Sequence, residues 1–318
     1  MQIERLIREQ IYLFKRRNKY RGIRLPKTEL QSYRRSLGII LVVVGLALIL
    51  SRCGKEEKKN IELKESTQAA VSQIDGVKED YYAYVQDFAI EENTLQELHQ
   101  LALKNKRPFS DTLALWTIEN YYGKTPKEIV KLIKNKRDLT TFDHYGLYEE
   151  TQKIYSQFSY NLICFPIAKK DSYTFENGWK QGRTYKGTRQ HYGIDIMDPD
   201  NTPGKIKVFS ITDGVIENIG WNELGGYRVG IRTHEGAYFY YAHLNQNPVH
   251  VKKGDSVSAG DYIGDMGDSG YGKEGTRGEF PVHLHVGIAV KTKDNEEFWI
   301  NPYYILRYLE LKDFVYRA

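Results

Sequence analysis

Cysteine is scarce in this sequence, with two residues among 318. Cys53 and Cys164 lie far apart, and neither belongs to a Cys-x-x-Cys pair. The sequence therefore predicts neither a disulfide framework nor a closed structural zinc site, which would usually contain thiolate ligands. The side chains left for binding a metal ion are histidines and carboxylates.

A basic excess is also lacking from most of the chain, although its formal net charge is +5. Residues 1–52 contain twelve Lys or Arg and three Asp or Glu, a net charge of +9, so the remainder must carry −4. A nucleic-acid-binding protein needs its basic residues on the folded body. We therefore expect no nucleic-acid partner.

One uncharged segment, residues 36–51, separates Arg35 from Arg52. As a helix it would span about 24 Å at 1.5 Å per residue, a little less than the ~30 Å hydrocarbon core of a bilayer. The flanking arginines could extend to the interface and make up the difference. Eleven basic residues precede the segment. The positive-inside rule therefore predicts a basic cytoplasmic tail at 1–35, a single membrane anchor at 36–52 and the rest of the chain outside the cytoplasm.

Two alternatives to an anchor remain open. The apolar part of the segment, residues 37–50, is fourteen residues long and also suits the hydrophobic region of a cleaved signal peptide. Leu50-Ser51-Arg52-Cys53 loosely resembles the lipidation motif of a lipoprotein, although Arg52 stands where a small residue is usual. Either would leave a secreted or lipid-anchored protein.

A charged stretch at residues 53–65 reads as a linker, and residues 66–160 have helical spacing. Leu95, Leu98 and Ala102 recur on one helical face, and Thr125-Pro126 predicts the start of another helix. We expect a small helical bundle that acts as a spacer or docks a protein partner. Glu119 invites comparison with a lysozyme-like catalytic acid, but an ordinary helical Glu is the better interpretation.

From residue 161 to 318 the pattern changes to short apolar runs separated by Gly-containing turns, which predicts a mostly antiparallel β domain. The recurrence of Val and Gly around residues 251–263 resembles the hairpins of lipoyl- and biotinyl-carrier domains, but no modifiable lysine signature accompanies it. Gly267-Asp268-Ser269-Gly270 resembles a serine-nucleophile loop until Tyr271 breaks the pattern. The overall prediction is an α+β protein with an N-terminal transmembrane helix.

Two short stretches carry side chains suited to metal binding. The first contains His191 and Asp195, and the second contains His283 and His285. Even spacing places such residues on one face of a β-strand. Two imidazoles and one carboxylate would suit Zn²⁺ and leave a fourth position open, as in catalytic zinc sites. Spacing alone leaves open whether both histidines of the second stretch bind the ion. His243 ends an aromatic run that reads as a strand between them.

With Tyr-Ala-His-Leu at residues 241–244, the three motifs resemble the lysostaphin-type (LytM-like) zinc endopeptidases of bacterial cell walls, over roughly residues 185–305. The resemblance implies a zinc groove in a β domain related to lipoyl and biotinyl barrels. It implies that His191, Asp195 and His285 bind zinc. It also implies that His243 and His283 flank the zinc-bound water as general base and transition-state stabiliser.

The expected function is thus a membrane-anchored zinc endopeptidase that acts on peptidoglycan peptides outside the cytoplasm. The alternative is a non-catalytic wall-binding or morphogenesis factor that uses the same groove. Degenerate zinc ligands would favour that alternative, and in this sequence all the ligands are intact.

Overall fold

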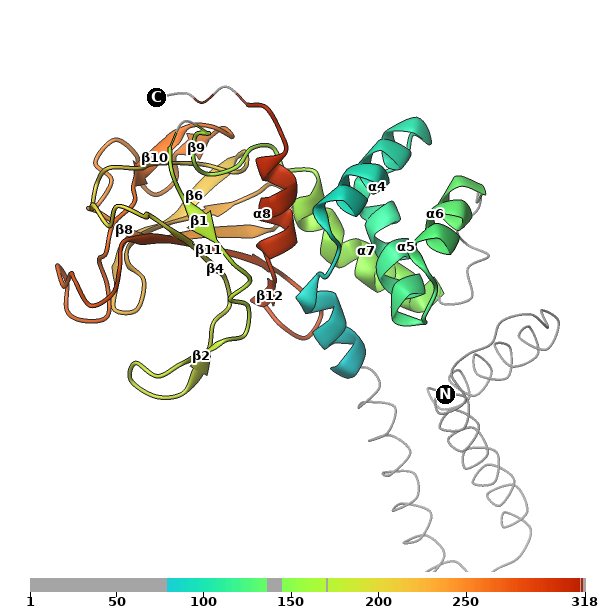
Figure 1. The fold of residues 1–318 in the computed structure, drawn as a ribbon, viewed down its shortest axis with the longest axis horizontal. Coiled ribbons are helices and arrows are strands. Elements are labelled where there is room, and N and C mark those ends of the chain that lie inside the picture. Colours follow the sequence, from blue (N-terminus) through green and yellow to red (C-terminus); the bar gives the residue numbers. More distant parts are fainter. Residues whose placement is uncertain (1–78, 136–144, 170, 315, 317–318) are drawn as a thin grey trace, which may run out of the picture. The chain divides into compact units, whose positions relative to one another are not determined.

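A computed structural model describes residues 79–135, 145–169, 171–314 and 316 (Figure 1). The predicted tail, anchor and linker lie outside these residues, as does the start of the predicted helical region. Within the described part of the chain, no helix has both the length and the apolar character needed to cross a bilayer. By their contacts, the described residues within Tyr84–Asn120, Thr125–Leu139 and His144–Ala318 form one compact unit.

Within the described residues the stretch 79–87 is helical, and four further helices precede the strands. Leu95, Leu98 and Ala102 are buried on the first of them, as their spacing predicts. The third begins at Pro126, where the Thr125 backbone N–H and hydroxyl both donate to Oε2 of Glu128, at 2.9 and 2.8 Å. This cap stabilises the start of the helix, as the sequence predicts. The helices are α4 (Glu92–Lys104), α5 (Phe109–Tyr121), α6 (Pro126–Asn135) and α7 (Tyr145–Ser159).

An antiparallel sheet follows, with strand order β1-β4-β11-β8-β7-β6-β9 and with β12 paired to β11. Two small sheets, β10-β5 and β2-β3, accompany it. The prediction of a mostly antiparallel β domain is confirmed, and the predicted domain boundaries stay a prediction. The strands are β1 (Thr174–Phe175), β2 (Gly182–Arg183), β3 (Arg189–Gln190), β4 (Ile194–Met197), β5 (Lys207–Phe209), β6 (Gly214–Asn222), β7 (Gly226–Arg232), β8 (Tyr238–Leu244), β9 (Ser256–Val257), β10 (Tyr262–Asp265), β11 (His283–Val290) and β12 (Phe298–Ile300).

The centre of the sheet separates a hydrophobic core from a polar face. Leu284, Val286 and Ile288 of β11 are completely buried. They alternate with His283 and His285, which therefore project from the opposite face. The same alternation that builds the core thus sets the direction of both histidines.

The helical layer, made of these helices and one more near the end of the chain, meets the sheet through α7. The last helix, α8 (Tyr303–Glu310), contacts α4, and α7 contacts β11 (Figure 1). The side chain of Gln157 on α7 forms two hydrogen bonds of 2.8 Å with the backbone of Lys291, which follows β11. Its Nε2 donates to the Lys291 carbonyl, and its Oε1 accepts from the Lys291 N–H. The strand that carries the two histidines is therefore anchored at its far end by the helical layer.

Candidate metal centre and active site

His191 is held in one orientation by the backbone of Gly178. Its Nδ1 lies 2.9 Å from the Gly178 carbonyl oxygen, which can only accept a hydrogen bond. Nδ1 must therefore carry the proton, and the lone pair of Nε2 is free to bind a metal. That Nε2 lies 3.0 Å from Oδ1 of Asp195 and 2.9 Å from Nδ1 of His285.

The route by which His191 meets Asp195 differs from the predicted one. The sequence predicts a single strand that carries both residues, but β3 ends at Gln190 and β4 begins at Ile194. The chain bends at Gly193 between them. An ideal Cβ at Gly193 would lie 2.4 Å from Cε1 of His285, so only glycine fits at this bend. The two side chains converge because of the bend, and not through alternation along one strand.

Asp195 is an ionised carboxylate with different partners on its two oxygens. Oδ1 faces the imidazoles, with Nδ1 of His285 at 3.0 Å. Oδ2 accepts a 2.6 Å hydrogen bond from Nη2 of Arg183. Burial raises the pKa of Asp195, but the contacts of its Oδ1 with the imidazoles of His191 and His285 outweigh this and hold the pKa well below its usual range. Asp195 therefore supplies a negative charge at neutral pH.

The donor set of this cluster fits zinc. The ligand atoms that His191, Asp195 and His285 can offer lie within 4.8 Å of one another. The atoms that would bind the ion are Nε2 of His191, Oδ1 of Asp195 and Nδ1 of His285. They lie 2.9 to 3.0 Å from one another. This is close to the separation of tetrahedral ligands, because bonds of ~2.0–2.1 Å place ligand atoms about 3.3 Å apart. Two imidazole nitrogens and a carboxylate oxygen are a catalytic zinc set with one position left for water. The cofactor that this site accommodates is Zn²⁺.

His243 and His283 lie beside the cluster, and each is held by a backbone carbonyl. Nδ1 of His243 donates to the Ser269 carbonyl at 2.8 Å, and Nδ1 of His283 donates to the Pro281 carbonyl at 2.7 Å. Their rings lie 4.7 Å apart between centroids. Burial lowers the pKa of both imidazoles, that of His243 most strongly. Both are therefore neutral, with Nε2 available to accept a proton.

The backbone of His243 departs from strand geometry. Its φ is 60°, in the left-handed region that non-glycine residues rarely adopt. Its N–H donates to the Gly225 carbonyl at 2.7 Å, which holds the strained residue in place. Strain of this kind is concentrated at functional sites. The structure thus brings together the five residues that the sequence predicts for the zinc site and its catalytic histidines, which are His191, Asp195, His243, His283 and His285.

Sequence reasoning missed three contributors to the site. Gly193 provides the bend, Arg183 orients Asp195, and the Ser269 carbonyl fixes the tautomer of His243. The first had a signal in the sequence, because a glycine midway between His191 and Asp195 indicates a close approach of the backbone. The other two depend on pairings between distant segments.

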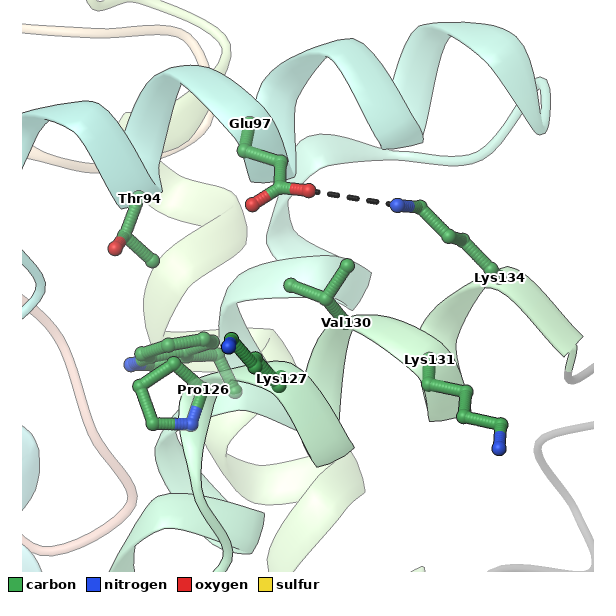
Figure 2. Close-up of a pocket in the computed structure, with 8 residues that line it drawn as sticks. Thr94, Glu97, Pro126, Lys127, Val130, Lys131 and Lys134 are labelled. Atoms are coloured by element: carbon green, nitrogen blue, oxygen red, sulfur yellow. Dashed lines mark ion pairs between the residues drawn. The ribbon is translucent and has the colours of Figure 1, made fainter.

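A separate pocket of about 560 Å³ lies in the helical layer, among α4, α5 and α6 (Figure 2). Glu97 of α4 and Lys134 of α6 form an ion pair of 3.5 Å across it. Glu119 does not line the pocket, and it is only 5% exposed. The predicted docking or spacing role of the helical region stays a prediction. The lining residues are Thr94, Glu97, Trp116, Pro126, Lys127, Val130, Lys131 and Lys134.

Comparison with known proteins agrees with this site. The sequence profile of peptidase family M23 matches residues 189–297. The chain is 36% identical to the L-Ala–D-Glu endopeptidase of Bacillus subtilis (strain 168) over 175 residues, which make up 54% of this chain and 51% of that protein. It is 37% identical to lysostaphin of Staphylococcus simulans over 107 residues, 33% of this chain and 19% of that protein. The chain thus spans about half the length of the first of these relatives and less of the second.

Among solved structures, the chain resembles a LytM protein of Ruminococcus gnavus ATCC 29149, to which glycyl-glycine endopeptidase activity is ascribed. The two are 33% identical with a TM-score of 0.59, and the match covers 71% of this chain and 90% of the other. Fold, motif order and metal-binding cluster together define a LytM-like metallopeptidase domain. The chain belongs to peptidase family M23.

Proposed function

We propose that this chain is a zinc endopeptidase that hydrolyses peptide bonds of bacterial cell-wall peptidoglycan. The observation that carries the proposal is the convergence of His191, Asp195 and His285 beside two neutral imidazoles. The relatives named as L-Ala–D-Glu endopeptidase and lysostaphin support the substrate class. The alternative of a non-catalytic wall-binding factor would need a degenerate site, and no observation favours it.

His191, Asp195 and His285 would hold the zinc ion. When bound, zinc would polarise the scissile carbonyl and lower the pKa of a water molecule. The carbonyl of Ser269 fixes the proton of His243 on Nδ1, which leaves Nε2 as a base facing the site. Nε2 of His283 lies 3.7 Å from Oδ1 of Asp195, so it faces the same space.

Two neutral imidazoles side by side suit a hydrolysis that needs a base and then an acid. One Nε2 takes a proton from the attacking water, and the resulting imidazolium can return a proton to the leaving amine nitrogen. The other imidazole would stabilise the charge that develops on the scissile carbonyl oxygen as a hydrogen-bond donor, which requires a proton on its Nε2 in the transition state. Burial keeps both groups neutral before the reaction, because it disfavours the charged form.

We also propose that the chain is anchored in the membrane through residues 36–52, with the zinc site outside the cytoplasm. The support is the charge step in the sequence, where a net charge of +9 up to residue 52 is followed by an acidic remainder. The segment lies outside the described residues. An external site would face the cell wall, where peptidoglycan is found.

Incubation of the purified full-length chain with zinc and isolated peptidoglycan tests the activity. Mass spectrometry of the soluble products should identify new peptide amino termini, and their position gives the bond that is cleaved. Glycan fragments with uncut peptides, or no products from a zinc-loaded protein, would reject the proposed activity.

A further inference from the structure

Two arginines stand side by side next to the metal cluster. In the β2–β3 hairpin, Arg183 is the direct partner of Arg189 in antiparallel pairing. Directly opposite residues project from the same face, and like charges in this position destabilise a hairpin. Arg183 is compensated by its 2.6 Å ion pair with Asp195. Over residues 79–135, 145–169, 171–314 and 316, Arg189 has no carboxylate partner.

The guanidinium of Arg189 is incompletely hydrogen-bonded. Nη2 donates to the Tyr271 hydroxyl at 2.9 Å, and Cζ lies 5.6 Å from the centre of the Tyr271 ring. Nε is buried and has no hydrogen-bond partner within the described part of the chain. A buried N–H without an acceptor is costly. The arrangement therefore holds a positive charge and an unused donor in one fixed place.

That place is connected to the catalytic side of the site by a short series of aromatic rings. The Tyr271 ring stacks on Tyr185, with centroids 4.4 Å apart and planes at 11°. The Tyr271 ring also lies 6.0 Å from the His243 ring and 4.9 Å from the Phe280 ring, between centroids. A peptide bound at His243 could therefore extend along Tyr271 and bring a neighbouring residue to Arg189.

We propose that Arg189 binds a free carboxylate of the substrate, close in sequence to the scissile bond. This inference rests on the proposed function and deepens it, because it makes the substrate an acidic peptide. A guanidinium is suited to this role, since it stays charged and its fork of donors matches the two carboxylate oxygens. Tyr271 holds the guanidinium from one side, and the substrate carboxylate supplies the negative charge that Arg189 lacks among the described residues. A neutral peptide would leave that charge uncompensated.

Binding can be measured apart from turnover in the zinc-loaded, full-length His243→Ala variant. The probes are two synthetic peptides that contain an L-Ala–D-Glu bond, one with the free D-Glu α-carboxylate and one with the carboxamide. Calorimetry should show that the acid binds about 10- to 100-fold more tightly, the range expected for hydrogen bonds to a charged group. Adding Arg189→Gln should abolish this preference, and adding Arg189→Lys should keep part of it.

Arg307→Gln is the matched control, because it removes the same charge from α8, where Arg307 pairs with Glu310. Its preference for the acid should equal that of the His243→Ala parent. Equal binding of the two peptides, or a preference that survives Arg189→Gln, would overturn the inference. Cleavage of peptidoglycan without any preference would reject the role of Arg189 alone. A preference for the acid without cleavage would reject the proposed activity alone.

Discussion

Asp195 and His285 are direct partners across the antiparallel strands β4 and β11, and Nδ1 of His285 lies 3.0 Å from Oδ1 of Asp195. The metal cluster is therefore a product of strand register. A shift of one residue would turn His285 into the core and Leu284 toward the site, because side chains alternate along a strand. The buried residues of β11 fix the register and with it the site.

Removal of any one donor should release the metal. His191→Ala, Asp195→Ala and His285→Ala each take away one of three donor atoms, so each variant should lose most of its zinc in metal analysis after dialysis. His234→Ala is the control, since its side chain is 99% exposed, and it should keep full occupancy. Full zinc content in all three site variants would reject this ligand set.

The glycine at the bend should be as important as the ligands. In Gly193→Ala the added methyl group would lie 2.4 Å from His285 and 2.7 Å from the Val286 carbonyl oxygen, so the imidazole must move. We expect zinc affinity to fall at least about tenfold, in line with displaced support around a metal site. Gly146→Ala on α7 meets no atom within 4 Å and should bind zinc normally. Unchanged affinity in Gly193→Ala would show that the close approach is unimportant.

The pair of Glu217 and Arg232 should make stability depend on pH. Two hydrogen bonds of 2.8 and 2.7 Å from Arg232 lower the pKa of Glu217 in the folded state below its unfolded value of about 4.3. The stabilisation is therefore present above that value and is lost as pH falls through the lower folded pKa. Glu217 is 39% exposed, so we expect only about 0.5–1 kcal/mol at pH 7.

Urea unfolding of wild type and Glu217→Gln at pH 7 and pH 3 measures this contribution. The difference in free energy of unfolding should shrink at the lower pH. Arg232→Gln and the double variant complete the cycle, which isolates the coupling between the two side chains. A difference that is the same at both pH values would argue against an ion-pair origin.

Membrane attachment should survive high salt. An inserted helix at residues 36–52 holds the chain through apolar burial, whereas attachment by basic residues alone would be screened. Full-length protein in washed membranes should therefore stay in the pellet and keep its N-terminal Lys/Arg-rich tail by mass spectrometry. A mature amino terminus at or near Cys53 would instead indicate signal cleavage or a lipoprotein.

The parts of the site that depend on short-range pattern were predictable from the sequence. Alternation placed His283 and His285 on one face of a strand, and the structure agrees. The predicted single strand through His191 and Asp195 was wrong, because Gly193 allows a bend that alternation does not describe. His191 and Asp195 do meet, as their spacing predicts, but they meet across a bend and not along one strand.

Contacts between distant segments were not predictable. The ion pair of Arg183 with Asp195 requires the pairing of β2 with β3, and the bond from His243 to Ser269 joins residues 26 positions apart. Nothing in the local pattern of α7 indicated that Gln157 would bond to Lys291, which is 134 positions away. Such contacts are set by tertiary packing and have no periodic signature in the sequence.

If a zinc site and a neighbouring imidazole base together hydrolyse peptidoglycan peptides, removal of the base should largely stop turnover and leave the metal in place. The most direct test measures zinc content and the release of new amino groups from peptidoglycan in wild type and His243→Ala, side by side. We predict equal zinc in both proteins, with release about 10²- to 10⁴-fold slower in the variant, as is typical for loss of a general base. Equal release at equal zinc content, or no release by zinc-loaded wild type, would contradict the account.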